Sequence, residues 1–254
     1  MFVACSTLCF GKYPLDQALR SISELEFHKV DVAIVEGSKQ LRPSEVVADV
    51  NRAAQRLRLG SGLMPGAFTV DIAARDAGEY ERQLRGVCRL ARLAMVPLIS
   101  ITAASSGSGL DAEIARLKRL SALAVAEGVL LTVETRIGTL TEHPATAVEM
   151  CQRVPELGLT LDPSHYIAGP NQNKNFDSVF PFVRHVRLRD TGLGADQFQV
   201  RVGQGEIEYG RIINGLARHR YDRLLTVDIR DIPDAPFAIP PEVRKLKYLL
   251  ESLI

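Results

Sequence analysis

The sequence lacks long apolar runs and an excess of charge of either sign, and each absence excludes a class of protein. No apolar run approaches the roughly 20 residues that a membrane span needs. The 31 Lys+Arg and 30 Asp+Glu residues leave a formal net charge of +1, which offers no general attraction to nucleic acid or to an anionic membrane. Neither nucleic acid nor a membrane is therefore expected as a partner.

Cysteine is scarce, and its spacing excludes a zinc cluster and a disulfide framework. The four cysteines, Cys5, Cys9, Cys88 and Cys151, are expected to be buried free thiols, which is typical of a protein of the reducing cytoplasm. The apolar start MFVACSTLCF has no basic residue before it. It is expected to form a first strand and not a signal peptide.

Phosphate-binding glycine loops are also missing, while a regular strand and helix alternation is present. Neither G-x-G-x-x-G nor G-x-x-x-x-G-K-[ST] occurs, and CFGKYP after the first strand is no substitute. The 254 residues divided among eight units give about 32 residues each, the size of a strand–helix repeat. The pattern predicts a single (β/α)8 TIM barrel that spans residues 1–254 as one domain. A doubly wound open sheet is the alternative.

The expected elements follow from apolar periodicity and from the glycines and prolines that separate them. The expected strands are Phe2–Phe10, Lys29–Val35, Arg58–Met64, Leu98–Ala103, Val129–Thr135, Gly158–Asp162, His185–Asp190 and Leu224–Ile229. The expected helices are Pro14–Phe27, Pro43–Leu57, Ala77–Ala94, Leu110–Glu127, Ala145–Arg153, Phe176–Val183, Tyr209–Arg218 and Pro241–Leu253.

Three strands of the second half end in a carboxylate: Glu134, Asp162 and Asp228. Because the carboxyl ends of the strands in a parallel barrel converge on one mouth, these side chains are expected to lie together. Clustered carboxylates repel one another and need a cation, a shared proton or an arginine. A divalent metal is the usual solution, and oxygen with imidazole ligands suits Mn²⁺, Mg²⁺, Co²⁺ or Zn²⁺. Capping of the following helix is the alternative role for each carboxylate.

Two histidines and one loop accompany these carboxylates. His165 follows Asp162 by three residues and is expected at the same mouth, whereas His185 begins the seventh strand. The glycines of residues 202–206 (VGQGE) could form a backbone nest for an anion or an ordinary loop before the next helix. Arg201, beside this loop, would bind a substrate carboxylate or phosphate, or else be a solvated side chain.

Together these motifs resemble the xylose-isomerase-like TIM-barrel superfamily, which includes sugar isomerases, ketose 3-epimerases, inosose and 3-dehydroshikimate dehydratases, and the endonuclease IV group. The resemblance covers essentially the whole chain as strand–helix units and is most specific in the second half. The run VETRIGTLTEHPAT is also similar to a segment of the dehydroshikimate dehydratase branch. The motifs that carry the resemblance are the Glu ending strand five, D-x-x-H (Asp162 to His165), an H-x-H-x-K-D-like strand seven (His185–Asp190), G-x-G-x-(I/V)-x-(F/Y) (Gly203 to Tyr209) and an acidic end to strand eight.

The resemblance implies roles for the residues at the strand ends. In this family the strand-five Glu, strand-six Asp, strand-seven His and strand-eight Glu bind one divalent metal, and the two glutamates move protons at substrate carbon. Glu134, Asp162 and Asp228 stand at three of these positions, although Asp228 is an aspartate where the family has glutamate. Arg187 stands in place of the usual ligand histidine, and Arg136 in place of a histidine of the dehydratase branch.

Two interpretations of the seventh strand stay open. In the first, His185 supplies the missing ligand, because residues two apart on a strand share a face, and the metal set is Glu134, Asp162, His185 and Asp228. In the second, the Arg187 guanidinium takes the place of the metal and forms salt bridges with the carboxylates. A divalent ion would then be weakly bound or absent.

The leading hypothesis is a sugar isomerase/epimerase-like enzyme that removes a proton next to the carbonyl of a small polyhydroxylated substrate. Glu134 would be the general base, Asp228 its partner acid or second base, and Arg187 or a metal the group that stabilises the enediolate. The residues expected to bind substrate are His165, Arg136 and Arg201. A 3-dehydroshikimate dehydratase-like lyase and a non-catalytic small-ligand-binding barrel are the alternatives. The expected partner is a small sugar or cyclic polyol, and a homo-oligomer remains an option.

Overall fold

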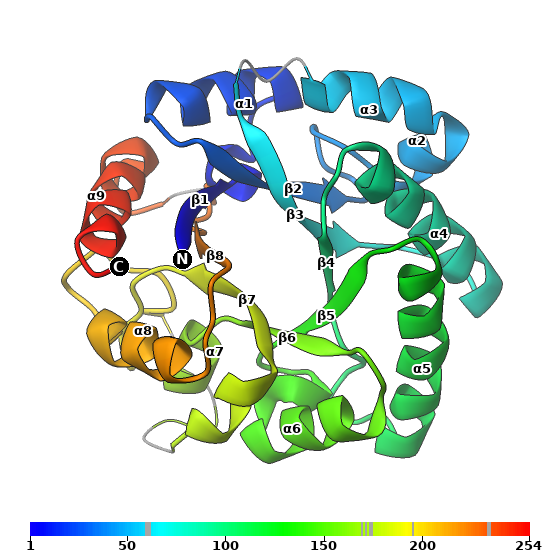
Figure 1. Cartoon of the computed structure of the whole chain (residues 1–254). Coiled ribbons are helices and arrows are strands. Elements are labelled where there is room, and N and C mark those ends of the chain that lie inside the picture. Colours follow the sequence, from blue (N-terminus) through cyan, green and yellow to red (C-terminus); the bar gives the residue numbers. More distant parts are fainter. Residues whose placement is uncertain (59–61, 169, 171, 173–174, 195, 233–234) are drawn as a thin grey trace.

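The strands close into a parallel barrel in chain order, with the last strand beside the first (Figure 1). The computed structural model describes residues 1–58, 62–168, 170, 172, 175–194, 196–232 and 235–254. This closed barrel confirms the predicted fold class and rules out the open sheet. The strands are β1 (Phe2–Ser6), β2 (Lys29–Val35), β3 (Met64–Asp71), β4 (Leu98–Ile101), β5 (Leu130–Glu134), β6 (Gly158–Leu161), β7 (Val183–Leu188) and β8 (Leu224–Val227).

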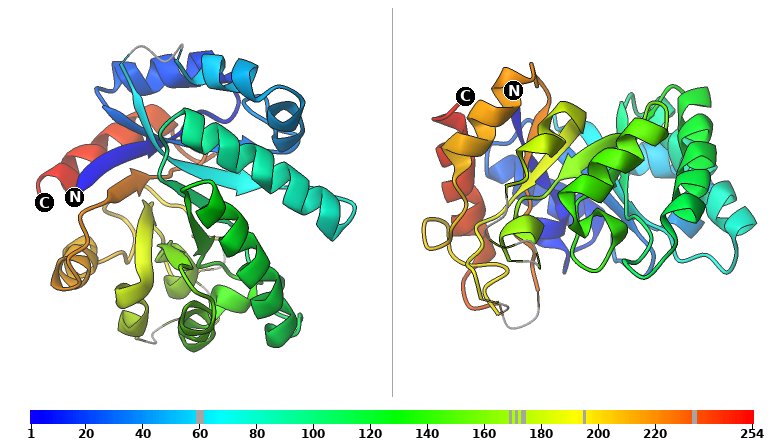
Figure 2. Two further views of the ribbon diagram at one scale, coloured as in Figure 1. Left: turned by 45° about the vertical axis from the view of Figure 1, so that its right-hand side comes forward. Right: turned by 90° about the horizontal axis from the view of Figure 1, so that it is seen from below.

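Helices surround the barrel on the outside, between successive strands (Figures 1 and 2). The α-helices are α1 (Leu15–Glu24), α2 (Pro43–Ala48), α3 (Val50–Arg58), α4 (Ala77–Leu93), α5 (Leu110–Ala126), α6 (Pro144–Arg153), α7 (Ser164–Ile167), α8 (Tyr209–Arg218) and α9 (Ile239–Glu251). The 3₁₀ helices are η1 (Thr7–Phe10), η2 (Leu140–Glu142) and η3 (Asp177–Phe182). Among the described residues, no helix is both long and apolar enough to cross a membrane.

The core lies between these helices and the barrel wall. Strands β4, β5, β6 and β8 are buried along nearly their whole length, as expected when helices cover a parallel sheet. Helix α4 shows how the sequence places a helix: Leu84, Val87, Cys88 and Ala91 repeat at helical spacing and are buried. Its N-cap, Asp76, accepts a hydrogen bond from the backbone N–H of Glu79 at 2.8 Å. All four cysteines are free and buried, as predicted.

The third strand was predicted in the wrong place. The prediction put it at Arg58–Met64, whereas Arg58 ends α3 and β3 begins at Met64. Residues 59–61 of the predicted strand lie outside the described residues. Gly62, two residues before β3 begins, has φ +82°, a left-handed conformation that glycine adopts readily. The run MPGAFTVD was overlooked because its Pro and Gly disguise an otherwise apolar strand.

The first predicted strand and two predicted helices also differ from the structure. The strand expected at Phe2–Phe10 ends at Ser6, and Thr7–Phe10 forms η1. The helix expected at Pro43–Leu57 is broken at Asp49, whose backbone is extended and whose side chain accepts from the N–H of Arg52 at 2.9 Å. Asp49 therefore caps a second helix. The helix expected at Phe176–Val183 is a 3₁₀ helix that contains Pro181, because proline removes a donor that an α-helix would need.

Candidate active site

The carboxyl ends of β5 to β8 bring charged side chains together inside the barrel mouth. Glu134 is the last residue of β5, and Asp162 and Asp228 directly follow β6 and β8. Arg187 and Arg189 lie at the end of β7, and all five side chains are at least 95% buried. The predicted convergence of strand ends is what places these residues within contact of one another.

Arg187 forms salt bridges with two of the carboxylates. Its Nη1 donates to Oε1 of Glu134 at 2.6 Å, and its Nη2 lies 3.1 Å from Oδ2 of Asp228. Deeper in the barrel, the Nε of Arg187 is 4.0 Å from Oδ2 of Asp31 on β2. A buried guanidinium that reaches several carboxylates is the arrangement expected if arginine takes the place of a cation.

Arg189 is a second buried arginine, and the sequence analysis missed it. Its Nη2 donates to Oδ2 of Asp162 and to Oδ2 of Asp228, both at 2.6 Å. Its guanidinium lies 5.1 Å from the ring centre of Phe198, a cation–π contact. The signal was present in the sequence, since positions 185, 187 and 189 alternate along one strand and share a face.

Arg230 is a third arginine at the site and was missed as well. It follows Asp228 by two residues, and its Nε donates to Oδ2 of Asp228 at 3.3 Å. Its Nη2 is 3.9 Å from Oε1 of Glu134, and its side chain is 32% exposed. One oxygen of Asp228 therefore faces three arginines, and Arg230 extends this charge toward solvent.

These arginines control the ionisation of the carboxylates. Burial alone would raise the pKa of Glu134, but the positive charges of Arg187 and Arg230 outweigh burial and lower this pKa to about 2. Burial likewise opposes ionisation of Asp228, and Arg187, Arg230 and Arg189 hold its pKa below the usual range. Both carboxylates are therefore ionised at neutral pH, and free Glu134 is a weak base.

His185 lies one layer deeper, in the polar interior of the barrel. Its Nε2 is 2.8 Å from Oγ1 of Thr226, and its Nδ1 is 3.4 Å from Oγ1 of Thr160. Burial lowers the pKa of His185 to about 3, so the ring is neutral. Asp31, 3.8 Å from Nε2 of His185, accepts from Thr69, and burial raises the pKa of Asp31 to about 6. Asp31 was not predicted, although it is a charged residue within an apolar strand.

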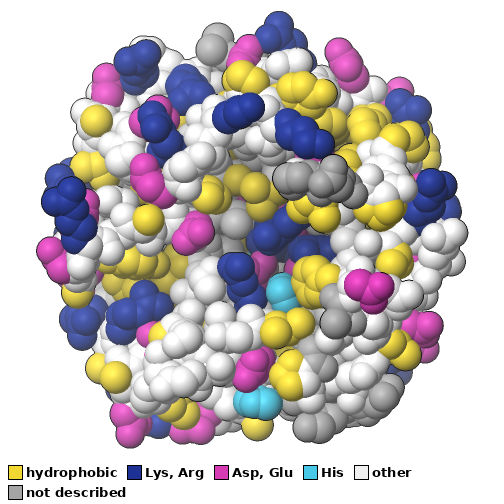
Figure 3. Space-filling model, turned by 180° about the vertical axis from the view of Figure 1, so that it is seen from behind, with side chains coloured by type: hydrophobic (Ala, Val, Ile, Leu, Met, Phe, Trp, Pro, Cys, Tyr) yellow, Lys and Arg dark blue, Asp and Glu magenta, His cyan; other side chains and the backbone are white. Residues whose placement is uncertain are grey.

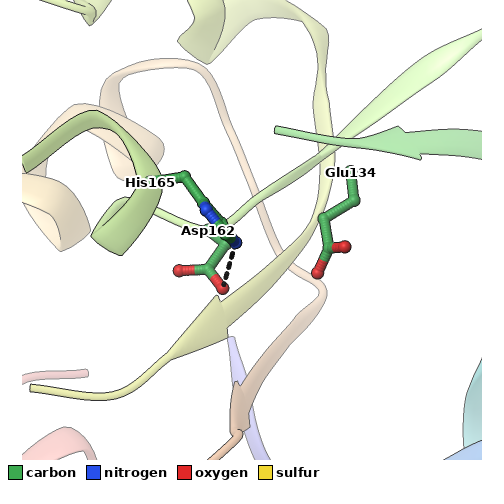
Figure 4. A group of neighbouring side chains, drawn as sticks. All are labelled: Glu134, Asp162 and His165. Carbon is green, nitrogen blue, oxygen red and sulfur yellow. Dashed lines mark ion pairs between the residues drawn. The ribbon is translucent and has the colours of Figure 1, made fainter. Parts of the chain in front are cut away.

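The described residues place His165, and not His185, with the mouth carboxylates (Figure 4). Glu134, Asp162 and His165 each offer a ligand atom within 4.8 Å of the others, a spacing that could hold a metal ion. Asp162 and His165 face each other, with Nε2 at 3.7 Å from Oδ2, while Glu134 points toward them from β5.

The tautomer of His165 opposes metal binding at this spot. Its Nδ1 accepts a hydrogen bond from the backbone N–H of Ile137 at 3.2 Å, so Nδ1 carries no proton. Burial lowers the pKa of His165, which keeps the ring neutral and leaves the single proton on Nε2. The nitrogen that faces Asp162 is therefore a donor without a free lone pair for a metal.

The remaining predicted substrate-binding residues differ in position. Arg136 reaches the mouth: its Nη1 is 3.8 Å from Oε2 of Glu134, and its side chain is 41% exposed. Arg201 is exposed and, within the described part of the chain, makes no salt bridge with Glu134, Asp162 or Asp228.

The glycine loop does form an anion nest, but its anion belongs to the chain. The N–H groups of Gly203 and Gly205 donate to Oδ2 of Asp190 at 2.6 and 3.2 Å. A side chain at position 205 would collide with Asp190 and with the backbone of Thr191, so the close approach requires glycine there. These donors anchor the loop and are not available to a substrate anion.

A (β/α)8 barrel with a buried, charged mouth at the carboxyl ends of its strands is the class that this fold and site define. The chain belongs to the xylose isomerase-like TIM barrel family, whose model matches residues 19–249. No curated protein matches the sequence.

Solved structures share the whole fold at low sequence identity. A D-allulose 3-epimerase from Methylomonas sp. is 12% identical, with a TM-score of 0.77, over 100% of this chain and 98% of the other. A probable 3-DHS dehydratase from Bacillus anthracis is 15% identical, with a TM-score of 0.73, over 97% and 98%. A xylose isomerase-like barrel from Mycobacterium smegmatis in complex with magnesium is 16% identical, with a TM-score of 0.75, over 100% and 98%.

Proposed function

We propose that the chain is a sugar isomerase/epimerase-like enzyme that moves a proton next to the carbonyl of a small polyhydroxylated substrate. The observation that carries this proposal is the ionised Glu134 at the mouth, 2.6 Å from the buried Arg187. Similarity to barrels named as 3-epimerases supports the same class of reaction. The four buried free thiols are compatible with a cytoplasmic enzyme.

In this mechanism Glu134 removes the proton and the arginines stabilise the charge that appears on oxygen. A carbonyl oxygen placed near the partly exposed Arg230 would accept a hydrogen bond from its preorganised guanidinium as the substrate becomes an enediolate. When the substrate engages Arg230 and Arg136, their charges act less on Glu134, and its pKa rises toward that of a useful base. Substrate binding would thereby activate the base.

The burial of Asp162 and Asp228 narrows the range of reactions that the site could catalyse. Asp162 and Asp228 are fully buried and bound to Arg189, whereas Glu134 lies within 4 Å of the partly exposed Arg136 and Arg230, so of these three carboxylates Glu134 is the one nearest the opening of the mouth. Epimerisation by proton transfer generally uses bases on both faces of the carbon, whereas an aldose–ketose isomerisation can use one base on one face. We therefore favour isomerisation, with Asp228 positioning the arginines and not acting as second base.

We further propose that the guanidinium groups replace the divalent metal of the family. Oδ2 of Asp162 is already bound by Arg189, Oε1 of Glu134 by Arg187, and Nε2 of His165 carries a proton. The three groups that have the spacing of a metal site thus do not fit the ion as they are arranged. The reaction would then be insensitive to chelators.

Proton exchange tests this function without knowledge of the substrate. The purified protein, treated with a chelator, is incubated in D2O with a panel of aldoses, ketoses and cyclic polyol ketones, and deuterium at the carbon next to the carbonyl is measured by NMR. Exchange that Glu134→Gln abolishes is the expected result. Absence of exchange across the panel would remove the proposal.

The low pKa of Glu134 favours a second candidate, a barrel that binds a small ligand without turnover. In that case ligands would raise the melting temperature of the protein, and no deuterium would be incorporated. A dehydratase-like lyase, suggested by the similar 3-DHS dehydratase, would instead give a conjugated product, visible by its ultraviolet absorbance in the same reactions.

A further inference from the structure

The part of the site that faces solvent is positively charged. The carboxylates of Glu134, Asp162 and Asp228 have side-chain exposures of 5%, 0% and 0%. Arg136 and Arg230, which lie on either side of Glu134, are 41% and 32% exposed. Figure 3 shows the face at which the strands end, where Lys/Arg, Asp/Glu and His side chains gather in a central hollow. A ligand that enters this hollow therefore meets the two arginines before the buried acids.

Both arginines are held in place at their base, with donors left over at their tips. The side chain of Gln199 binds the backbone of Arg230 on both sides: its Oε1 accepts from the N–H at 2.7 Å, and its Nε2 donates to the carbonyl at 3.0 Å. The backbone N–H of Arg136 donates to Thr141, and its Nη1 donates to Thr102 at 3.3 Å. Among the described residues, each guanidinium makes one side-chain hydrogen bond, which leaves most of its five N–H donors for a ligand.

The charge balance points the same way. Within this group of ion pairs, four guanidinium groups, those of Arg136, Arg187, Arg189 and Arg230, face three carboxylates, those of Glu134, Asp162 and Asp228. Asp31 faces Arg187 from deeper in the barrel, where it is fully buried. Two acids close to the mouth have partners of their own: Asp231 forms a salt bridge with Lys12, and Glu142 accepts from the N–H of Gly138.

From this arrangement we infer that the substrate is anionic, a polyol or sugar that carries a carboxylate or phosphate held between Arg136 and Arg230. The inference rests on the proposed function for the place of the reacting carbon, next to Glu134. Guanidinium groups bind both oxyanions through paired N–H donors, so the shared chemistry is a terminal oxyanion.

Three probes with the same six-carbon chain test this inference by isothermal titration calorimetry: D-gluconate, D-glucitol 6-phosphate and uncharged D-glucitol. Because hydrogen bonds between a guanidinium and an oxyanion are stronger than those to a neutral hydroxyl, at least one anion should bind about tenfold or more tightly than glucitol. The better of the two anions identifies the substrate as an acid or a phosphate ester.

Variants assign the binding to the two arginines. Arg136→Gln and Arg230→Gln should each weaken anion binding about tenfold and weaken glucitol binding clearly less, and Arg230→Lys should restore part of the loss of anion binding. The matched control is Arg82→Gln on α4, where the side chain of Arg82 is 66% exposed. This variant should bind all three probes as the parent does. Circular dichroism checks folding, and the half-exposed position of Arg136 keeps that variant informative even if Arg230→Gln unfolds.

Equal affinity for all three probes would overturn the inference. So would inorganic phosphate that binds as tightly as glucitol 6-phosphate, since the site would then hold an adventitious ion only. Selective anion binding without deuterium exchange would keep the inference and remove the proposed enzyme. Deuterium exchange into neutral sugars, with no preference for anions, would keep the proposed enzyme and remove the inference. The two proposals therefore fail separately.

Discussion

Removing the two buried arginines should convert the mouth into a metal site. The perturbation is Arg187→His with Asp228→Glu, which restores the family's ligand types, and then Arg189→Met in addition, which removes the second charge. We expect the parent to purify with far less than one divalent ion per chain. The double variant should bind Mn²⁺ or Zn²⁺ more tightly than the parent, and the triple variant should bind more tightly still.

The structure sets the size of this effect. Arg189 Nη2 lies 2.6 Å from Oδ2 of Asp162. A metal at a bond length of about 2.1 Å from that oxygen would be no more than about 4.7 Å from the guanidinium nitrogen. With an effective dielectric constant near 20, a divalent ion at that distance is repelled by about 7 kcal/mol. This corresponds to about five powers of ten in affinity for one arginine, and Arg187, bound to Glu134, adds to it.

Elemental analysis and calorimetric titration with Mn²⁺ and Zn²⁺ measure the outcome. As a control, Asp162→Asn in the triple variant should remove the gained binding, because it deletes a ligand and leaves the rest of the pocket. One tightly held divalent ion per chain in the untreated parent would refute the electrostatic reasoning. The arginines would then have to move away from the carboxylates when the ion binds.

Three further predictions concern the base, the buried ion pairs and pH. Glu134→Gln should lower deuterium exchange by about 10²–10⁴-fold, and retained exchange would show that the base lies elsewhere. Because this substitution also breaks the buried salt bridge with Arg187, it should lower the melting temperature, and circular dichroism checks that the variant is folded at the assay temperature. Arg189→Met alone leaves Asp162 and Asp228 short of a partner and should destabilise the fold by about 3–5 kcal/mol, which calorimetry would register as a melting temperature lowered by roughly 6–20 °C. Arg82→Met on exposed α4 should stay within about 0.5 kcal/mol of the parent, and equal effects of the two would contradict the role of Arg189. Burial raises the pKa of Asp31 from 3.8 to about 6, so its favourable contribution is complete below pH 3.8 and is lost as pH rises through 6. Asp31→Asn should therefore stabilise the protein more at pH 7.5 than at pH 4 in urea unfolding, and an equal effect at both pH values would show that the native carboxyl is not shifted.

The barrel could be predicted because its repeats are regular and its strands are apolar. Where the prediction was wrong, a residue with a local role interrupted the period: Gly62 took a left-handed conformation before β3, Asp49 capped a new helix, and Pro181 converted an α-helix to a 3₁₀ helix. Such interruptions are set by single backbone conformations. Apolar periodicity averages over several residues and does not register them.

The carboxylates of the site could be predicted, and two of their four arginine partners could not. A carboxylate that ends an apolar strand stands out in a sequence, since parallel barrels place that end at the mouth. Arg189 and Arg230 were missed because arginine is mostly a surface residue. Although Arg189 shares a face of its strand with Arg187, its burial depends on partners from other strands. Asp162 and Asp228, which fix Arg189, are 27 and 39 residues away from it along the chain. Only the closed barrel brings these three residues together.

We infer that the two departures from the ligand set that the resemblance implies, Arg187 and Asp228, are physically linked. Aspartate at position 228 is one methylene shorter than the glutamate of the family, which leaves room beside it. Guanidinium groups occupy that room: Oδ2 of Asp228 lies 3.1 Å from Arg187 and 2.6 Å from Arg189. With glutamate at position 228, the side chain of Arg187 would be crowded. With aspartate at position 228 but no arginine at position 187, the buried carboxylate would lack a partner for its charge. We therefore expect Asp228→Glu alone, with both arginines retained, to destabilise the protein more than Arg187→His and Asp228→Glu together in the presence of Mn²⁺. Additive effects of the two substitutions in a double-mutant cycle would show that the positions act independently.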